Sequence, residues 1–172
     1  MIAVIQSTAF AVDFYSQISV WFTCAVNTNS MLQEIASFID KNKVATICGI
    51  GEDHAPYCFN CFYAFDAKNQ LLFFKSSSAS KHSKILLKNE RVSGTILPDK
   101  LELLAIKGIQ FSGKVLYESF PEQIRPEVSY HKRFPLALAK PGDVWCIQLQ
   151  MVQMTDNTQV FGKKTEWVKQ PC

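Results

Sequence analysis

The chain has 172 residues, which favours one domain, and 48% of them are hydrophobic, including 13 Phe. A chain of this composition can build a core without disulfides or metal ions. Its net charge of +3 is spread along the sequence, which argues against nucleic-acid binding, because such proteins concentrate Lys and Arg in a patch.

The first 30 residues differ from the rest, since they contain no Lys or Arg and only one charged residue, Asp13. Their apolar part lacks the positively charged start of a secretory signal. Polar residues interrupt it, so it is a poor membrane span. We therefore expect residues 1–30 to be a disordered or natively untranslated extension, with Met31 as the natural start. Residues 31–172 should form a cytoplasmic domain that has no membrane contact.

Six cysteines occur: Cys24, Cys48, Cys58, Cys61, Cys146 and Cys172. Their spacing matches no disulfide scaffold, so we expect free thiols in a reducing cytoplasm. Cys58 and Cys61 form a C-x-x-C within a predicted strand. Side chains alternate along a strand, so these two should point to opposite faces, which opposes a shared metal ion or a disulfide between them. We expect no metal site.

The hydrophobic pattern from residue 31 predicts a helix and then mainly strands. Apolar residues over 31–39 recur at helical spacing, with Ser30 as a candidate N-cap and Gln33 as its capping-box partner. Three strands are predicted next, at 43–50, 55–65 and 70–75, with turns at 51–54 and 66–69. Short turns between successive strands indicate an antiparallel meander.

The second half alternates further strands with two helical segments. The predicted helices cover 81–88 and 121–133, and the predicted strands cover 91–97, 101–116, 143–154 and 165–169. Pro126 must begin or break its helix, because proline lacks the N–H that a helix interior needs. Gly108 and Gly113 are candidate bend or bulge positions in the long fifth strand.

The segment with the clearest chemical content runs from the third strand into the helix at 81–88. A strand delivers Ser76 into a serine-rich loop, which ends at Ser80 and is followed by Lys81 and His82 in the first helical turn. Free N–H groups at a helix N-terminus favour an anion, and hydroxyl and cationic side chains add donors. Together they suit a phosphate monoester. On pattern alone, a solvated loop with an ordinary N-cap is the commoner explanation.

This segment resembles the FMN phosphate motif of the pyridoxamine 5'-phosphate oxidase-like superfamily. The matching residues are Ser76, Ser80, Lys81, His82, Asn89 and Val92. The preceding strand also resembles the family, through Pro56, Asn60, Phe62, Tyr63 and Asp66. The resemblance implies a mainly β fold with peripheral helices: an FMN-binding split β-barrel of six antiparallel strands with Greek-key-like order.

The resemblance also implies positions for the cofactor. It places Asn60, Cys61 and Tyr63 near the flavin ring, and Lys75 and Ser76 near its ribityl-phosphate end. Ser80, Lys81 and His82 would hold the phosphate, and Gln110 would lie on the strand that a partner subunit lays against the ring.

Residues 133–135 and 155–167 resemble a small bacterial branch of that superfamily. True pyridoxamine phosphate oxidases have Arg and Lys on the first flavin strand, where this chain has Cys58 and Tyr63. We therefore do not expect vitamin B6 oxidation. Residues 161–164 could form a basic loop over the cofactor or a solvated hairpin tip.

The expected function is FMN binding, with flavin-dependent oxidoreduction of an unidentified substrate. The electron donor would be a nicotinamide or another small molecule, and no catalytic residue is identified. A non-enzymatic flavin carrier or sensor, or a split-barrel binder of haem or deazaflavin, is the alternative. We expect a homodimer, because a barrel of this type leaves its flavin half-covered and a two-fold partner completes the cleft.

Overall fold

The computed structural model describes residues 31–100, 106–117, 123–158 and 163–170. The chain divides into two units, 1–30 and 31–172. Residues 1–30 lie outside the described part, so the expectations about them and about Met31 as the start stay predictions. Residues 101–105, 121–122 and 161–162 also lie outside the described part, and the expectations about them stay predictions.

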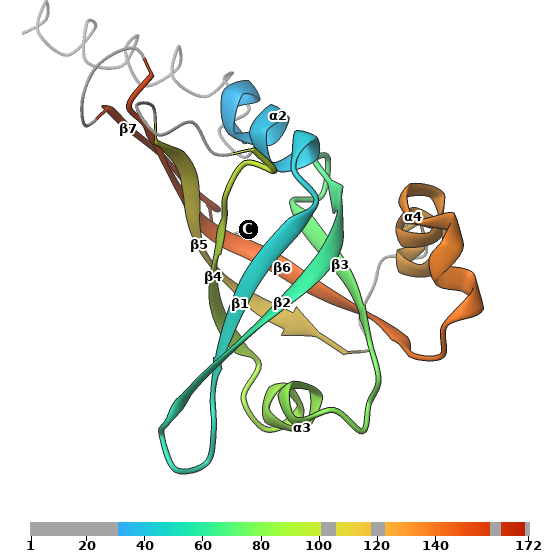
Figure 1. The fold of residues 1–172 in the computed structure, drawn as a ribbon. Coiled ribbons are helices and arrows are strands. Elements are labelled where there is room, and N and C mark those ends of the chain that lie inside the picture. The colour runs from blue at the N-terminus through green and yellow to red at the C-terminus, as the bar shows by residue number, and fades with distance from the viewer. Residues whose placement is uncertain (1–30, 101–105, 118–122, 159–162, 171–172) are drawn as a thin grey trace, which may run out of the picture. The chain divides into compact units, whose positions relative to one another are not determined.

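Seven strands form one antiparallel sheet in the order β3-β2-β1-β4-β5-β6-β7, and a further pairing of β3 with β6 closes six of them into a barrel (Figure 1). The strands are β1 (Val44–Ile50), β2 (Pro56–Asp66), β3 (Leu71–Ser76), β4 (Arg91–Ile96), β5 (Lys107–Leu116), β6 (Asp143–Asp156) and β7 (Lys163–Val168). The expected six-stranded split barrel with peripheral helices is confirmed, and β7 extends it along β6.

The helices are α2 (Gln33–Lys41), α3 (Lys81–Lys88), α4 (Pro126–Arg133) and the short 3-10 helix η1 (Pro135–Ala139). The bounds of α3 match the prediction, and Pro126 begins α4 as expected. The predicted capping box is wrong. Leu32 occupies the N-cap of α2 without a side-chain cap, and the side chain of Gln33 donates to Ser37 Oγ instead. None of the described helices is long and apolar enough to span a bilayer.

The core fills the barrel and the end covered by α2. The buried face of α2 consists of Ile35, Ala36, Phe38 and Ile39, which belong to the same cluster as Phe74 and Ile147 of the strands. A second cluster lies on the other face of β3. It joins Leu71, Phe73 and Cys146 with Tyr130 of α4. The two clusters fix both faces of β3, so the end of this strand at Ser76 is firmly placed.

The bulge expected in β5 occurs at Gly113 and not at Gly108. The register of β5 against β6 shifts between Ser112 and Gly113 and stays regular at Gly108. A Cβ at Gly113 would lie 2.7 Å from the carbonyl oxygen of Gln148, so this close approach of two backbones requires glycine.

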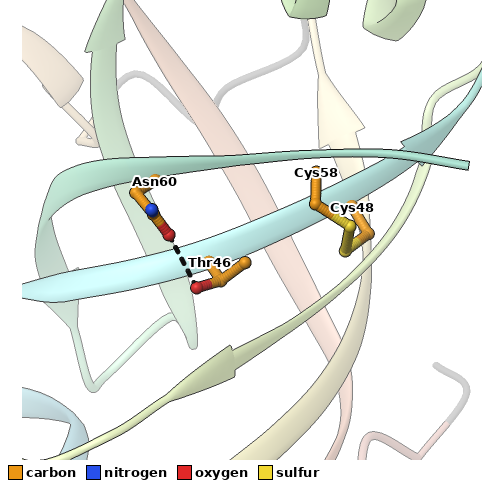
Figure 2. The surroundings of a disulfide bond; sticks show 4 residues. All are labelled: Thr46, Cys48, Cys58 and Asn60. Carbon is orange, nitrogen blue, oxygen red and sulfur yellow. Dashed lines mark hydrogen bonds between the residues drawn. A yellow bond between two sulfur atoms is a disulfide. The ribbon is translucent and has the colours of Figure 1, made fainter.

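The expectation of free thiols is wrong for one pair, because Cys48 and Cys58 form a disulfide between β1 and β2 (Figure 2). They lie directly opposite each other in the antiparallel ladder, with Cα atoms 4.1 Å apart. Directly opposed residues bring their Cβ atoms within disulfide range. Cys61 and Cys146 are free thiols, and the expected lack of a Cys58–Cys61 disulfide is confirmed.

β2 and β3 pair with each other over only part of their lengths. β2 pairs with β3 only over Tyr63–Asp66, and its first part, 56–62, pairs only with β1. β3 continues to Ser76 along β6 instead. This separation produces the split in the barrel, and the candidate site lies there.

Candidate functional site

A cavity of about 500 Å³ lies between the first part of β2, the end of β3, the start of α3, and the α4–η1 segment. This volume is within the usual range for small-molecule sites. Its apolar wall consists of Phe59, Phe62, Tyr130, Phe134, Leu136, Ala137 and Pro141. Its polar residues are Asn60, Cys61, Lys75, Ser76, Ser77, His82 and Lys140.

A serine–histidine cluster of Ser76, Ser80, His82 and Ser83 lies beside the cavity. Ser76 and His82 line the cavity, whereas Ser80 and the buried Ser83 lie behind them. Ser76 Oγ lies 2.6 Å from His82 Nε2 and 3.3 Å from Ser80 Oγ. Ser80 is the N-cap of α3, and its Oγ accepts a hydrogen bond from the Ser83 N–H at 3.2 Å. The cluster gathers hydroxyl groups and an imidazole at a helix N-terminus, where the helix dipole favours negative charge.

His82 is held by an aromatic ring as well as by Ser76. Its imidazole stacks on Phe59 of β2, with ring centroids 4.0 Å apart and an interplanar angle of 12°. Burial lowers the pKa of His82 from its ordinary value of 6.5. The lower pKa favours the neutral imidazole, which carries a single N–H.

Lys81 does not line the cavity. Its Nζ lies over the ring of Tyr57, 4.6 Å from the centroid. It borders a separate hollow of about 380 Å³ together with Lys84 and Lys88. The sequence placed Lys81 and His82 in one anion site, but the structure directs these neighbouring side chains to different hollows.

Lys75 lines the cavity on the opposite face of β3 from Ser76. Its Nζ donates to the carbonyl oxygen of Ala137 at 2.9 Å and lies 3.3 Å from His131 Nε2. These contacts tie η1 and α4 to β3. They also hold an ammonium group in the cavity wall.

The residues expected near the flavin ring separate into two groups. Asn60 and Cys61 line the cavity, and Asn60 Oδ1 accepts a hydrogen bond from Thr46 Oγ1 at 2.7 Å (Figure 2). Burial raises the pKa of the Cys61 thiol to about 12, so it stays protonated at neutral pH. Tyr63 is only 1% exposed, and its hydroxyl donates to the Ile39 carbonyl at 2.6 Å, so the structure does not bring it to the cavity. Gln110 is an exposed residue of β5, opposite Thr95 of β4. Its expected place against the flavin of a partner subunit stays a prediction.

Sequence reasoning missed the α4–η1 side of the site. Phe134 lies in the 133–135 resemblance, but no site role was assigned to it, and Tyr130 and Leu136 carry no motif. Their role depends on how this segment folds back over β3. Phe59 could have been found, because it alternates with Asn60 on a predicted strand. The described residues contain no group of His, Cys, Asp and Glu side chains suited to a metal ion. The expectation of no metal site covers the whole chain, so it stays a prediction.

Solved structures of low sequence identity share the fold. A haem-binding protein from Mycobacterium smegmatis has a TM-score of 0.67 and 14% identity, over 84% of this chain and 59% of that one. A pyridoxinephosphate oxidase family protein from Clostridium acetobutylicum has a TM-score of 0.56 and 13% identity, over 78% and 92% of the two chains. An FAD-binding protein from Mesorhizobium loti has a TM-score of 0.54 and 18% identity, over 71% and 91%.

No protein-family profile matches the chain. Whole-length relatives are nevertheless clear. A UPF0306 protein of Serratia proteamaculans is 38% identical over 144 residues, which cover 84% of this chain and 99% of the relative. A UPF0306 protein of Photorhabdus laumondii is 33% identical over 83% of this chain and 99% of its own length. The chain therefore belongs to the UPF0306 family.

Proposed function

We propose that the cavity binds FMN, with the phosphate at the serine–histidine cluster and the flavin ring along the apolar wall. The main support is that Ser76 and His82 line a largely apolar cavity at the N-terminus of α3, with Ser80 behind them in contact with Ser76. A phosphate monoester needs several donors at a helix N-terminus, and a flavin ring needs flat apolar surface beside them. The resemblance to the FMN phosphate motif supports the same assignment.

The charge of the cavity also supports an anionic ligand. Lys75 and Lys140 line it, and no Asp or Glu is found among its described lining residues. Because Lys75 is fixed by Ala137 and His131, its ammonium group is held in place before a ligand arrives. A preorganised cation stabilises an anion without the cost of ordering a flexible side chain.

The proposed activity is oxidoreduction, with a nicotinamide or another small molecule as electron donor. Bound flavin supplies one- and two-electron chemistry, and the protein supplies binding, orientation and exclusion of water. Phe59 and Phe134 would orient the ring, while Lys75 would stabilise negative charge beside it. Cys61 stays a neutral thiol and takes no part as a nucleophile. A flavin carrier or sensor would use the same site without turnover.

Haem is the second candidate, favoured by the fold shared with the haem-binding protein of M. smegmatis. Haem iron is commonly held by a histidine. The Nε2 atoms of His82 and His131, the histidines at this site, already contact Ser76 and Lys75. That arrangement favours flavin over haem. The absorption spectrum of the purified protein separates the two, by a Soret band or by the bands of oxidised flavin.

We also propose that the protein works as a cytoplasmic homodimer. Val44 of β1, Phe62 of β2 and Leu97, which follows β4, are exposed around one hollow, and Phe62 also lines the cavity. A second copy over this hollow would bury these side chains and cover the open side of the site. Light scattering should give a dimer for the wild type and a monomer for Val44→Glu. A wild-type monomer that binds FMN tightly would contradict the dimer.

The test of FMN binding compares FMN with riboflavin, which lacks the phosphate. Ser76→Ala and His82→Ala should each raise the Kd for FMN by about tenfold, because each removes a donor to a charged group. The Kd for riboflavin should change by less than about twofold. Ser78→Ala is the matched control, since Ser78 is an exposed residue of the same loop. Equal losses for both flavins would show that the phosphate does not bind there.

Turnover is tested separately. FMN-loaded protein is mixed anaerobically with NADH or NADPH, and bleaching of the flavin absorbance is followed against a free-FMN control. Bleaching faster than that control supports the oxidoreductase. Its absence for both nicotinamides favours the carrier or sensor.

A further inference from the structure

The β1–β2 hairpin leaves the sheet at the disulfide. Cys48 is the last residue of β1 that pairs with β4, opposite Ser93. Beyond it, Gly49 and Ile50 pair only with β2, so residues 49–57 form a two-stranded projection, here called the tip ribbon (Figure 1). Two-stranded ribbons are marginally stable by themselves. The Cys48–Cys58 bond therefore lies at the base of the ribbon, where the support of the sheet ends.

The tip ribbon packs on α3. Tyr57 carries Lys81 Nζ over its ring, and Glu52 forms a 2.6 Å ion pair with Lys88. A Cβ at Gly49 would lie 3.3 Å from Ile85 and Leu86, so the ribbon backbone approaches the helix closely. These contacts span α3 from its first residue to its last. The ribbon thus contributes contacts to α3, whose N-terminus belongs to the candidate site, beside those that Leu86 makes in the core.

Phe59, the residue after Cys58 on β2, gives a further contact between this region and α3. Its ring stacks on His82. Hence Tyr57 and Phe59, on either side of Cys58, contact Lys81 and His82, the two consecutive basic residues of α3. A shift of β2 at Cys58 would therefore alter both the Tyr57–Lys81 and the Phe59–His82 contact.

The disulfide is accessible, whereas the described free thiols are not suited to attack it. Cys58 is exposed and Cys48 half-buried. Cys146 is buried and Cys61 half-buried, and burial raises the pKa of each thiol to about 12. The thiolate is the attacking species in exchange, so a reductant from solution is the effective partner.

We propose that the Cys48–Cys58 disulfide is a redox-responsive clamp on the anion-binding end of the cavity. When oxidised, it holds the tip ribbon against α3 and so fixes the serine–histidine cluster and Lys81. A dithiol reductant transfers two electrons and two protons, the S–S bond becomes two thiols, and the reductant becomes a disulfide. The released ribbon then loosens the first turn of α3 and lowers its affinity for phosphate. Disulfides in cytoplasmic proteins are commonly transient or redox-sensing, in keeping with this role.

The inference rests on the proposed FMN function for the identity of the ligand, but part of its test needs no ligand. Mass spectrometry of protein kept under oxidising conditions should find a peptide that links Cys48 to Cys58. Hydrogen exchange of residues 81–88 should be faster after reduction with dithiothreitol. Absence of the linked peptide, or equal exchange in both states, would overturn the clamp.

The ligand arm measures Kd for FMN and for riboflavin in both redox states. Reduction should raise the Kd for FMN by about fivefold, through weakened Lys81 and His82 contacts, and leave riboflavin nearly unchanged. The double variant Cys48→Ser/Cys58→Ser should match reduced wild type and should not respond to dithiothreitol. An unchanged FMN affinity on reduction overturns the clamp but leaves FMN binding intact. If neither flavin binds in either state, the proposed function fails, and hydrogen exchange alone decides the clamp.

Discussion

The imidazole of His82 lies nearly parallel to the phenyl ring of Phe59, 4.0 Å away, while its Nε2 contacts Ser76 Oγ at 2.6 Å. These three residues come from α3, β2 and β3, so the imidazole is fixed by three elements at once. The orientation of the candidate phosphate site is therefore a property of the barrel, not of the serine-rich loop alone.

Phe59→Leu should weaken FMN more than riboflavin. Loss of the stacked ring frees His82, and an aromatic contact of this kind is worth about 0.5–1.5 kcal/mol, so the ratio of the two Kd values should rise about two- to twelvefold. Phe62→Leu is the matched control, because Phe62 lines the same cavity but packs on Phe134 instead of His82. It should affect both flavins alike. Flavin fluorescence titration measures all four constants, and an unchanged ratio for Phe59→Leu would contradict the role of the stack.

Lys81→Ala should also weaken FMN selectively. Lys81 rests on Tyr57 in the structure and does not line the cavity, so to bind the phosphate its side chain must leave Tyr57. We expect the Kd for FMN to rise by at least about tenfold and that for riboflavin to stay unchanged, since a charge-assisted hydrogen bond contributes about 1.5–3 kcal/mol. Lys84→Ala, about one helical turn after Lys81, should change the Kd for FMN and the Kd for riboflavin by less than about twofold each. Equal losses for both flavins with Lys81→Ala would show that Lys81 is not a phosphate ligand.

His82 should make the free protein less stable in mild acid. Burial places the pKa of folded His82 below the ordinary value of 6.5, so the unfolded chain takes up its proton at a higher pH than the folded chain does. The free energy of unfolding must then fall as the pH drops below about 6.5, through the lower folded pKa. Urea unfolding near pH 7.5 and near pH 5.5 measures this fall. It should be smaller for His82→Gln, and an identical fall in the variant would assign the acid sensitivity to other groups.

The ion pair between Lys107 and Asp156 should stabilise the pairing of β5 with β6. Hydrogen bonds from Lys107 and from Thr158 lower the pKa of Asp156 from 3.8 to about 2. This stabilisation is present above pH 4 and is lost as the pH falls through the folded pKa. Asp156→Asn should reduce the free energy of unfolding by about 1–2 kcal/mol at pH 7 and by much less near pH 2.

Glu90→Gln is the comparison for that variant. Its partner is Lys114, and both side chains are 43% exposed, against 12% for Asp156. Removing such an exposed pair should cost less than about 1 kcal/mol. If Asp156→Asn costs no more than Glu90→Gln in denaturant titrations, burial of the Lys107–Asp156 pair adds nothing to stability.

Local signals in the sequence were sufficient for most elements. The bounds of α3 were predicted correctly because Ser80 is a strong N-cap and Asn89 follows an amphipathic turn. Pro126 marked the start of α4, and alternation marked the strands. The resemblance at Ser76 to Val92 then indicated the barrel. The first helix was predicted to begin too early, because the capping box was inferred from local sequence alone. In the structure α2 begins at Gln33, and Leu32 is its N-cap.

The sequence by itself thus determined most strands and helices, and through the family resemblance it indicated the split barrel and a candidate anion-binding turn. Only the tertiary structure decided how they meet. It directs Lys81 to Tyr57, encloses Tyr63 in the core, brings α4–η1 over Lys75, and joins Cys48 to Cys58. The physical reason is that each of these depends on strand register and on packing between segments distant in sequence. Such contacts are fixed by the whole barrel, and a local pattern carries no information about them.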